Sequence, residues 1–265
     1  MRWHADGPCT GFVRKDRLPQ ALAQGSVFQR GDDGSMRLLG ESFADRSERI
    51  ATFAASLEAA GEIALRRELF PLTDDFQLPP CAAIDRGLVP WLGVRPYGVH
   101  LCAYVRKEGA LFVFVAVRSR TKSFPGAWDN TVAGGQPLGL SLLDNVIKEC
   151  DEEASIPREI AVRAVPTATI TYVREDATGL KPDTLFCHDL ELPPDFEPRP
   201  RDGEVERFLC IPAAELAHTV REQARCKPNC SLVWIEFLLR HGELDGDTTA
   251  ADRTELRRRL LAPLP

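Results

Sequence analysis

The 265-residue sequence lacks both a hydrophobic run long enough to cross a lipid bilayer and an excess of basic residues. Its longest unbroken run of aliphatic and aromatic residues covers only 111–117, whereas a transmembrane helix needs about 20 apolar residues. Acidic residues outnumber basic ones by 39 to 33, which gives a formal net charge of −6. A surface of that sign does not attract nucleic acids or anionic membranes, so we expect neither as a partner.

The sequence also lacks a secretory signal pattern, internal repeats and clustered cysteines. The first residues, MRWHADGPCTG, do not combine a charged start with an apolar stretch, which favours a cytoplasmic location. The eight cysteines are dispersed, and the closest two, Cys226 and Cys230, do not have the two-residue separation of common zinc and redox motifs. We therefore expect buried free thiols and no disulfide framework.

What the sequence does contain is an ordinary globular composition, 44% hydrophobic. Residues 1–95 predict a small α+β domain, with short strands at 11–14 and 26–30 and an amphipathic helix over about 45–67. Five prolines between 71 and 96 predict a linker or irregular crossover at the end of this domain, because proline fixes φ and removes a backbone donor.

Residues 96–265 predict a second, α/β domain in which a sheet is sandwiched between helices. Two strand-like runs joined by the turn at 107–110 begin this domain, and the second run is apolar throughout, as in a strand covered on both faces. A glycine-rich stretch then leads into a helix that begins near Ser141. Further strands are expected at about 165–173, 184–190 and 204–211, and helices at about 213–224 and 230–241, before a charged tail.

The helix that follows Ser141 carries the most informative pattern. Ser141 and Asp144 match the Ser-x-x-Asp capping pattern, and apolar residues recur at helical spacing along one face. Glu149, Glu152 and Glu153 lie together in an arc of about 100° beside that face. Such crowded carboxylates repel one another and lose hydration, which a bound divalent cation relieves. The pattern therefore favours a magnesium site, although acidic helix faces are more often simply solvated.

The loop before this helix strengthens the metal interpretation. Gly134, Gly135 and Gly139 allow the backbone to approach a ligand phosphate or metal-bound water closely. Glycines alone also make ordinary turns. The indication therefore comes from the combination of the glycines with the three glutamates that follow them.

Residues 134–156 resemble the Nudix box, G-x(5)-E-x(7)-R-E-U-x-E-E-x-G-U, in which U is a bulky aliphatic residue. The segment KECDEEASI at 148–156 covers the second half of the box, with Gly134 at its first glycine. A glutamate, an arginine, an aliphatic residue and a glycine of the box are replaced here by Leu140, Lys148, Cys150 and Ser155. The resemblance implies a Nudix α/β/α sandwich with a mixed sheet, and it assigns Mg²⁺, with Mn²⁺ as a substitute, to Glu149, Glu152 and Glu153.

Further segments resemble one Nudix subgroup, the proteins related to thiamine pyrophosphokinase. These segments are 97–100, 118–122, 125–129, 202–206 and 227–230. The similarity covers most of the chain and includes a small N-terminal domain, which could shape the substrate pocket or form a homodimer contact. Members of this subgroup are associated with converting thiamine diphosphate, especially its oxidised derivatives, to the monophosphate.

The resemblance thus predicts a Mg²⁺-dependent pyrophosphohydrolase that cleaves a small organic diphosphate, with oxidised thiamine diphosphate as the leading substrate. Catalysis also needs a group that takes a proton from water. One of the box glutamates can do so, and Glu204 and Glu206 are candidates because residues two apart share one face of a strand. A hydrolase of nucleoside diphosphate-linked compounds needs the same metal ligands, and a degenerate module that binds a diphosphate without turnover fits the departures from the box. Both alternatives stay open.

Five further side chains are weighed as substrate contacts or bases. Arg118, Arg120 and Lys122 follow the apolar strand at alternate positions and could converge on a phosphate, although surface solvation is the commoner fate of basic residues. Trp128 could stack on a heteroaromatic ring, although core packing is the default for tryptophan. His100, inside an apolar strand, is expected to be a core histidine with satisfied hydrogen bonds and not a general base.

Overall fold

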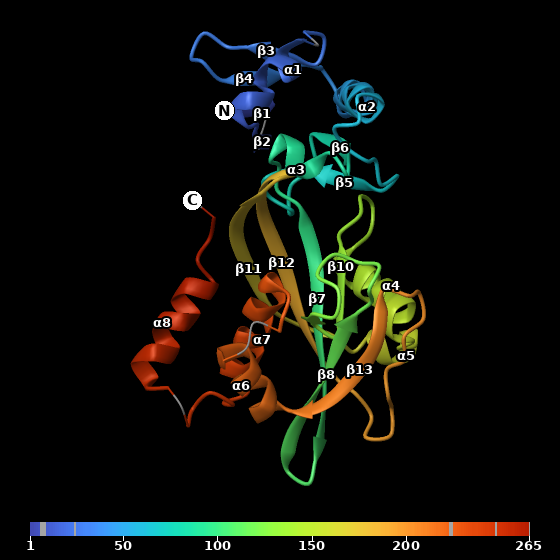
Figure 1. Ribbon diagram of the computed structural model, residues 1–265, viewed down its shortest axis with the longest axis vertical. Helices are drawn as coiled ribbons and strands as arrows, with labels where there is room; N and C mark the ends of the chain where they lie inside the picture. The colour runs from blue at the N-terminus through green and yellow to red at the C-terminus, as the bar shows by residue number, and fades with distance from the viewer. Residues whose placement is uncertain (6–8, 24, 223–224, 247, 265) are drawn as a thin grey trace.

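The computed structural model describes residues 1–5, 9–23, 25–222, 225–246 and 248–264. The chain forms two units, with the N-terminal unit at the top of Figure 1. That unit holds a four-stranded sheet in the order β2-β1-β4-β3. Its first elements are β1 (Arg2–Ala5), β2 (Cys9–Phe12), the 3-10 helix η1 (Lys15–Arg17), α1 (Leu18–Ala23), β3 (Phe28–Arg30), β4 (Met36–Leu38) and α2 (Phe43–Ala59).

Helix α2 is the amphipathic helix that the sequence predicts, although it is shorter than expected. It begins after Ser42, whose hydroxyl accepts a hydrogen bond from the Asp45 amide at 3.1 Å. Phe53 and Leu57 bury its apolar face in the core of the N-terminal unit. The helix ends at Ala59 and not near residue 67, because the chain reverses at Gly61, which has a φ of 74°.

The proline-rich segment is not the irregular linker that the sequence suggests. Ile84 and Trp91 in this segment are buried in the core of the N-terminal unit, which extends to Val94. Prolines are tolerated because Pro71 lies in a two-stranded sheet and Pro90 in the first turn of a helix, where no helical donor is lost. The elements formed here are β5 (Leu69–Leu72), β6 (Ala82–Asp85) and α3 (Val89–Leu92).

The second unit is built on a seven-stranded mixed sheet. The main strand order is β11-β12-β7-β8-β13, while β10 pairs with β7 and β9 pairs with β8. Strands β12 and β7 run parallel, whereas the other pairs are antiparallel. The strands are β7 (Tyr97–Lys107), β8 (Ala110–Arg118), β9 (Trp128–Asp129), β10 (Val132–Gly135), β11 (Val165–Asp176), β12 (Gly179–Glu191) and β13 (Val205–Pro212).

Helices cover both faces of this sheet, so the expected α/β/α sandwich is confirmed (Figure 1). Helices α4 and α5 pack on one face and α6 and α7 on the other, each pair over its own hydrophobic core. A further helix, α8, forms where a charged tail was expected, because Thr249 and Asp252 make a capping box at its start. The helices are α4 (Leu142–Ala154), α5 (Arg158–Ala161), α6 (Ala213–Glu222), α7 (Pro228–Arg240) and α8 (Ala250–Leu260).

The expectation of buried free thiols is wrong for two of the described cysteines, Cys81 and Cys210, of which Cys210 is free but exposed. Cys81 is disulfide-bonded, so the expectation is wrong there, because spacing along the chain does not tell which cysteines the fold brings together. The side chain of Cys9 lies outside the described residues. The free cysteines are Cys102, Cys150, Cys187, Cys210, Cys226 and Cys230.

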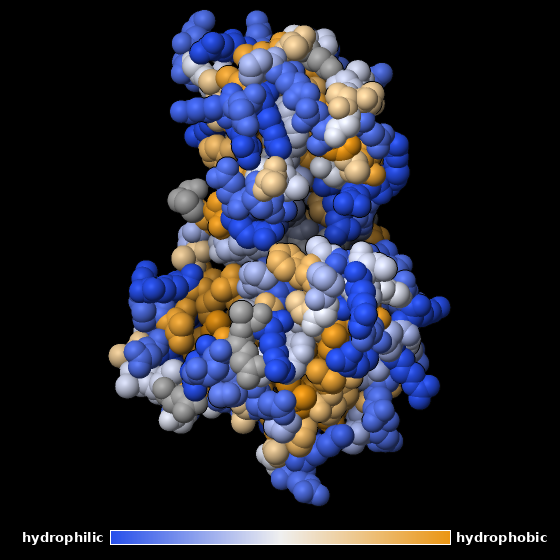
Figure 2. All heavy atoms as spheres, viewed as in Figure 1, coloured by the Kyte–Doolittle hydropathy of each residue, from blue (hydrophilic) through white to orange (hydrophobic). Residues whose placement is uncertain are grey.

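The surface of the two units differs in character. Hydrophilic side chains cover most of the visible face of the N-terminal unit, whereas hydrophobic side chains gather on the left of the second unit (Figure 2). No helix within the described residues combines the length and the apolar character needed to cross a membrane. The molecule narrows where the two units meet (Figure 2), and residues of both units line a cavity at that junction.

Candidate active site

Strand β10 and helix α4 bring together the glycines and two of the glutamates that the sequence singles out. Gly134 packs directly against the side chain of Glu149, and a Cβ at position 134 would overlap the Glu149 carboxyl carbon. One position earlier, the Ala133 amide donates a hydrogen bond to Glu153 Oε2 at 2.9 Å. Glycine at position 134 therefore allows a charged side chain of α4 to lie against the strand.

Glu149 and Glu153 are buried carboxylates, 8% and 7% exposed. Burial raises the pKa of Glu149, and repulsion from the nearby Glu68 contributes to the rise. Burial also raises the pKa of Glu153 well above its usual value, with added repulsion from Glu149, Asp129 and Glu204. The strand and the helix thus concentrate negative charge that a divalent cation would neutralise.

Glu152 does not join this buried pair. Its side chain is 48% exposed and pairs with Lys148 at 2.7 Å, while the same ammonium reaches Glu149 Oε1 at 3.0 Å. The lysine that replaces the arginine of the box therefore bridges a buried and a solvent-facing carboxylate. Within the described part of the chain, the three glutamates do not place their oxygens within the 4.8 Å spacing of a preassembled metal site.

At the end of α4, a serine replaces a glycine of the box and adopts a left-handed backbone conformation. The helix stops at Ser155, which stands where the box has glycine and has a left-handed φ of 52°. That conformation is unfavourable for a residue with a Cβ. The Ser155 hydroxyl donates a hydrogen bond to the Arg199 carbonyl at 3.0 Å, which offsets part of the cost.

A cavity of about 500 Å³ lies beside β10, and Gly134 and Gly135 form part of its wall. This volume is in the range of small-molecule sites. Cationic side chains suit phosphate oxygens, and aromatic faces suit a planar ring. Four side chains of each kind line the cavity: Arg86, Arg174, Lys181 and Lys227, and Phe70, Tyr97, Phe124 and Tyr172.

The three basic residues expected to converge on a phosphate are separated in the structure, and none of them lines this cavity. Arg118, with its side chain 14% exposed, pairs with Asp129 at 2.6 Å. Lys122 pairs with Glu204, and Arg120 lines a separate surface hollow. Strand alternation does not hold for these residues, because β8 ends at Arg118 and the chain then turns.

Glu204 and Glu206 do not share a strand face as the sequence suggested. Glu204 precedes β13, and its carboxylate lies close enough to Glu153 to raise the pKa of that residue beyond the effect of burial. Glu206 pairs instead with its neighbour Arg207 at 2.6 Å. A β-bulge after Val205 breaks the alternation of the strand. Of the two candidate bases, Glu204 is the one whose charge adds to the rise in the Glu153 pKa, and its carboxylate is paired with Lys122.

Trp128 and His100 are core side chains. Trp128 is 7% exposed and packs in the core between the sheet and α7, outside the cavity. His100 is 4% exposed, and its Nδ1 lies 2.7 Å from Asn130 Oδ1. Burial lowers the pKa of His100 to about 4, with a further contribution from Lys227. The expectation of a hydrogen-bonded core histidine is therefore confirmed.

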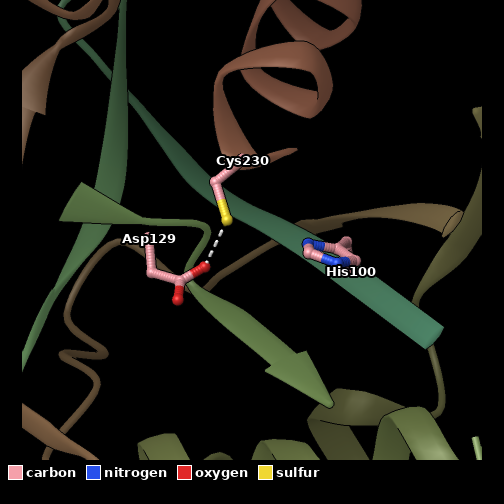
Figure 3. Close-up of side chains that lie close together, drawn as sticks. All are labelled: His100, Asp129 and Cys230. Carbon is pink, nitrogen blue, oxygen red and sulfur yellow. Dashed lines mark hydrogen bonds between the residues drawn. The ribbon is translucent and has the colours of Figure 1, made fainter. Parts of the chain in front are cut away.

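Asp129 is the centre of a buried group that the sequence did not reveal (Figure 3). His100 on β7, Asp129 on β9 and Cys230 on α7 each offer one possible metal-ligand atom, all within 4.8 Å of one another. The Cys230 thiol donates to Asp129 Oδ1 at 2.6 Å, and Arg118 and Lys227 approach Oδ2 at 2.6 and 3.5 Å. Burial opposes ionisation, but Lys227, the thiol and the other neighbours hold the pKa of Asp129 at about 2. Arg118 and Lys227 already compensate the charge of Asp129. Because Asp129 lies on β9 and accepts a hydrogen bond from Cys230 of α7, the group holds α7 against the sheet.

The donor atoms at β10 and α4 fit the divalent metal that the resemblance implies. Glu149 and Glu153 offer only carboxylate oxygens, which Mg²⁺ and Mn²⁺ prefer. The amide of Ala133 orients Glu153, and the repulsion between the two buried acids is what a bound cation removes. Glu152 lies at the exposed edge of this donor set.

Sequence reasoning missed most of the side chains that line the cavity. Phe70 and Arg86 lie in or beside the segment interpreted as a linker. Arg174 and Lys181 lie on the hairpin of β11 and β12, where their spacing carries no recognisable signal. The position of Lys227 could be recognised from the sequence, because it precedes a proline at a helix start. In the structure Lys227 is the N-cap residue of α7, and its side chain makes no capping hydrogen bond.

Comparison with known proteins agrees with the motif formed by β10 and α4, although no protein-family model matches this chain. The chain is 41% identical over 210 residues to Nudix hydrolase 20, chloroplastic, of Arabidopsis thaliana, covering 78% of this chain and 56% of that protein. It is 39% identical over 237 residues to Nudix hydrolase 24, chloroplastic, of the same plant, covering 88% of this chain and 65% of that protein.

A solved structure, the NUDIX domain of Shewanella oneidensis NrtR complexed with ADP ribose, is 16% identical, with a TM-score of 0.42, and the match covers 52% of this chain and 84% of that one. The chain spans between a half and two thirds of the length of the two plant relatives. Identity of about 40% extends over more than three quarters of this chain. The chain is therefore related to the Nudix hydrolases.

Proposed function

We propose that this protein is a Mg²⁺-dependent pyrophosphohydrolase of the Nudix type. The proposal is carried by one observation, the pair of buried glutamates, Glu149 and Glu153, which α4 holds against β10. The glycines of β10, Gly134 and Gly135, line the cavity. The substrate is a small organic diphosphate, which is cleaved to its monophosphate. Mn²⁺ can replace Mg²⁺ at a site made of carboxylates.

The reaction transfers a phosphoryl group to water: a bond forms between the water oxygen and phosphorus, the bond to the bridging oxygen breaks, and a proton is released. A bound divalent cation neutralises charge on the diphosphate and lowers the pKa of water. In this chain, Glu149 and Glu153 hold the ion and Lys148 orients Glu149 through their ion pair. Glu204 is our candidate for the group that takes the proton, because its charge contributes to the raised pKa of Glu153.

We further propose oxidised thiamine diphosphate derivatives as the leading substrate class. The segments 97–100 and 227–230, through which the chain resembles the thiamine-related subgroup, both contribute side chains to the cavity wall. Phe124 and Tyr172 supply aromatic faces for a heteroaromatic ring, and Asp183 supplies a carboxylate on the same wall. Nucleoside diphosphate-linked compounds present the same combination of ring and diphosphate and are the rival substrates.

A second candidate function, binding of a diphosphate without turnover, is favoured by Lys148. Its ammonium pairs with both Glu149 and Glu152, so it neutralises charge that a metal ion would otherwise neutralise. Leu140, which precedes α4 and replaces the first glutamate of the box, removes another carboxylate from the motif. A binding module and an enzyme differ in one measurable property, the release of product.

Release of monophosphate from a panel of diphosphates, with Mg²⁺, with Mn²⁺ and with EDTA, tests the proposal. The panel contains thiamine diphosphate, its oxidised derivatives and ADP-ribose. We expect the parent protein to hydrolyse at least one compound with Mg²⁺ and none with EDTA, and Glu153→Gln to slow turnover by about a hundredfold or more. Glu159→Gln, which changes an exposed glutamate of α5, is the matched control and retains the parental rate.

Two outcomes would contradict the proposal. Binding of the diphosphates without product release under any of these conditions identifies a binding module. Turnover by Glu153→Gln at the parental rate shows that this carboxylate holds no essential metal.

A further inference from the structure

The N-terminal unit supplies part of the cavity wall. Phe70 on β5 and Arg86, which follows β6, line the cavity together with Gly135 of β10. The contact between the units is close, because a Cβ on Gly135 would lie only 2.5 Å from Phe70 Cζ. The Leu138 amide also donates a hydrogen bond to the Leu69 carbonyl at 2.8 Å. These contacts fix the side chains of the N-terminal unit relative to the glycine strand.

Arg86 is held in a defined orientation on this wall. Its Nη1 donates to Glu68 Oε2 at 2.9 Å, and its backbone amide donates to the Glu68 carbonyl at 2.9 Å. Its guanidinium carbon lies 5.7 Å from the centroid of the Phe70 ring. The side chain is 53% exposed, and its remaining N–H groups have no hydrogen-bond partner among the described residues. Because one side of the guanidinium is held in this way, its remaining N–H groups can donate parallel hydrogen bonds to phosphate oxygens.

The ion-pair partner of Arg86, Glu68, is an acidic neighbour of Glu149. Glu68 lies close enough to Glu149 for repulsion to add to the effect of burial on the Glu149 pKa. Arg86 and Gly134 line the same cavity, and Glu149, a proposed metal ligand, packs against Gly134. The basic residues that the sequence favoured for phosphate binding, Arg118 and Lys122, are instead paired with carboxylates outside this cavity.

We propose that Arg86 binds the diphosphate group of the substrate, so that the N-terminal unit completes the active site of the second unit. This inference rests on the proposed function and adds a binding residue to it. Phe70 is a positioning residue, because its ring supports the guanidinium and packs on Gly135. Of the two roles that the sequence left open for the N-terminal domain, this one is the shaping of the substrate pocket.

The test compares binding with turnover in Arg86→Ala, Arg86→Lys and a control. Binding of methylenediphosphonate, a diphosphate analogue that is not hydrolysed, is measured by calorimetry in the presence of Mg²⁺, and KM and kcat are measured on whichever diphosphate the parent hydrolyses. We expect Arg86→Ala to raise the Kd and the KM by about ten- to a hundredfold, the range for losing hydrogen bonds to a charged group. Arg86→Lys keeps the charge but loses the fork, so its Kd lies in between.

The matched control is Arg67→Ala, which removes another arginine of the same unit. Its side chain is 73% exposed, pairs with Glu58 and does not line the cavity. We expect a parental Kd and KM for this variant. Thermal unfolding of all variants separates loss of binding from loss of structure, and Arg86→Lys supplies a second, milder substitution at the same position.

Each outcome supports or overturns the inference. If Arg86→Ala binds and turns over like Arg67→Ala, the inference is wrong while the proposed function stands. If Arg86→Ala loses binding and the parent hydrolyses no diphosphate, the proposed function is wrong while Arg86 remains a diphosphate-binding residue. A parent protein that neither binds the analogue nor hydrolyses any diphosphate overturns both.

Discussion

Gly134 on β10 lies directly against the carboxyl group of Glu149 on α4, with no room for a Cβ between them. The contact joins the two halves of the acidic motif, since the glycine belongs to the strand and the glutamate to the helix. It also keeps a charged side chain buried, with Lys148 as its ion-pair partner. The glycine is therefore needed for space, not for a positive φ.

Gly134→Ala is expected to displace Glu149 and to lower kcat by about tenfold or more, because small misplacements of groups at an active site are costly. The free energy of unfolding is expected to fall by about 1–3 kcal/mol, the usual cost of overpacking. Steady-state kinetics and urea unfolding measure the two effects. Gly25→Ala is the control, since a Cβ there meets open space, and a Gly134→Ala protein as active as this control would contradict the assigned contact.

The stability of the metal-free protein is expected to fall as the pH rises. Burial raises the pKa of Glu153 well above the ordinary value of 4.5, so the folded state binds this proton more tightly than the unfolded chain does. Stability therefore decreases from about pH 4.5 upward until the raised pKa is passed. Urea unfolding in EDTA between pH 5 and 8 measures this decrease, which Glu153→Gln should reduce.

Added Mg²⁺ should reverse the loss in the parent, because a ligand that binds only the folded state stabilises it. Glu159→Gln should keep the pH dependence and the response to Mg²⁺ of the parent. Parallel stability curves for the parent and Glu153→Gln would show that the buried carboxyl does not titrate as assigned.

Local patterns were enough to predict α4, which carries the three glutamates, but not β10, since Gly134 and Gly135 were expected in a loop. Ser141 caps α4 as expected, with its hydroxyl accepting the Asp144 amide at 3.1 Å, and the turn at 107–110 joins β7 to β8. Each of these features depends on residues within a few positions of one another. The sheet between helices followed from the order of such elements along the chain.

The parts that the sequence could not predict depend on distant contacts or on irregular backbone. Asp129 accepts a hydrogen bond from a thiol 101 positions away, and no local pattern encodes that contact. The bulge after Val205 separates Glu204 from Glu206, although simple alternation would place them together. The prolines near Arg86 suggested a linker, whereas the apolar residues between them form the core of the N-terminal unit.

Ser155→Gly is expected to raise the free energy of unfolding by about 0.5–1 kcal/mol. Glycine removes the penalty of a Cβ at a φ of 52°, and the lost hydrogen bond to the Arg199 carbonyl reduces the gain. Ser155→Thr is the informative counterpart, because it keeps the hydroxyl but adds a branched Cβ in the left-handed region, and it should be less stable than the parent. Urea unfolding ranks the three proteins, and an order with threonine above glycine would mean that the hydrogen bond outweighs the strain.

Asp129→Asn is expected to cost about 3 kcal/mol of stability, because removing one member of a buried ion pair leaves its partners uncompensated. Arg118 and Lys227 both pair with this carboxylate, at 2.6 and 3.5 Å. Since Lys227 is the N-cap of α7, amide exchange in the first turn of α7 should accelerate together with the loss of stability. Asp151→Asn breaks the ion pair between two half-exposed side chains, Asp151 and Arg201, and should cost less than about 1 kcal/mol. An equal loss of unfolding free energy in the two variants would mean that the charge of Asp129 does not hold α7 against the sheet.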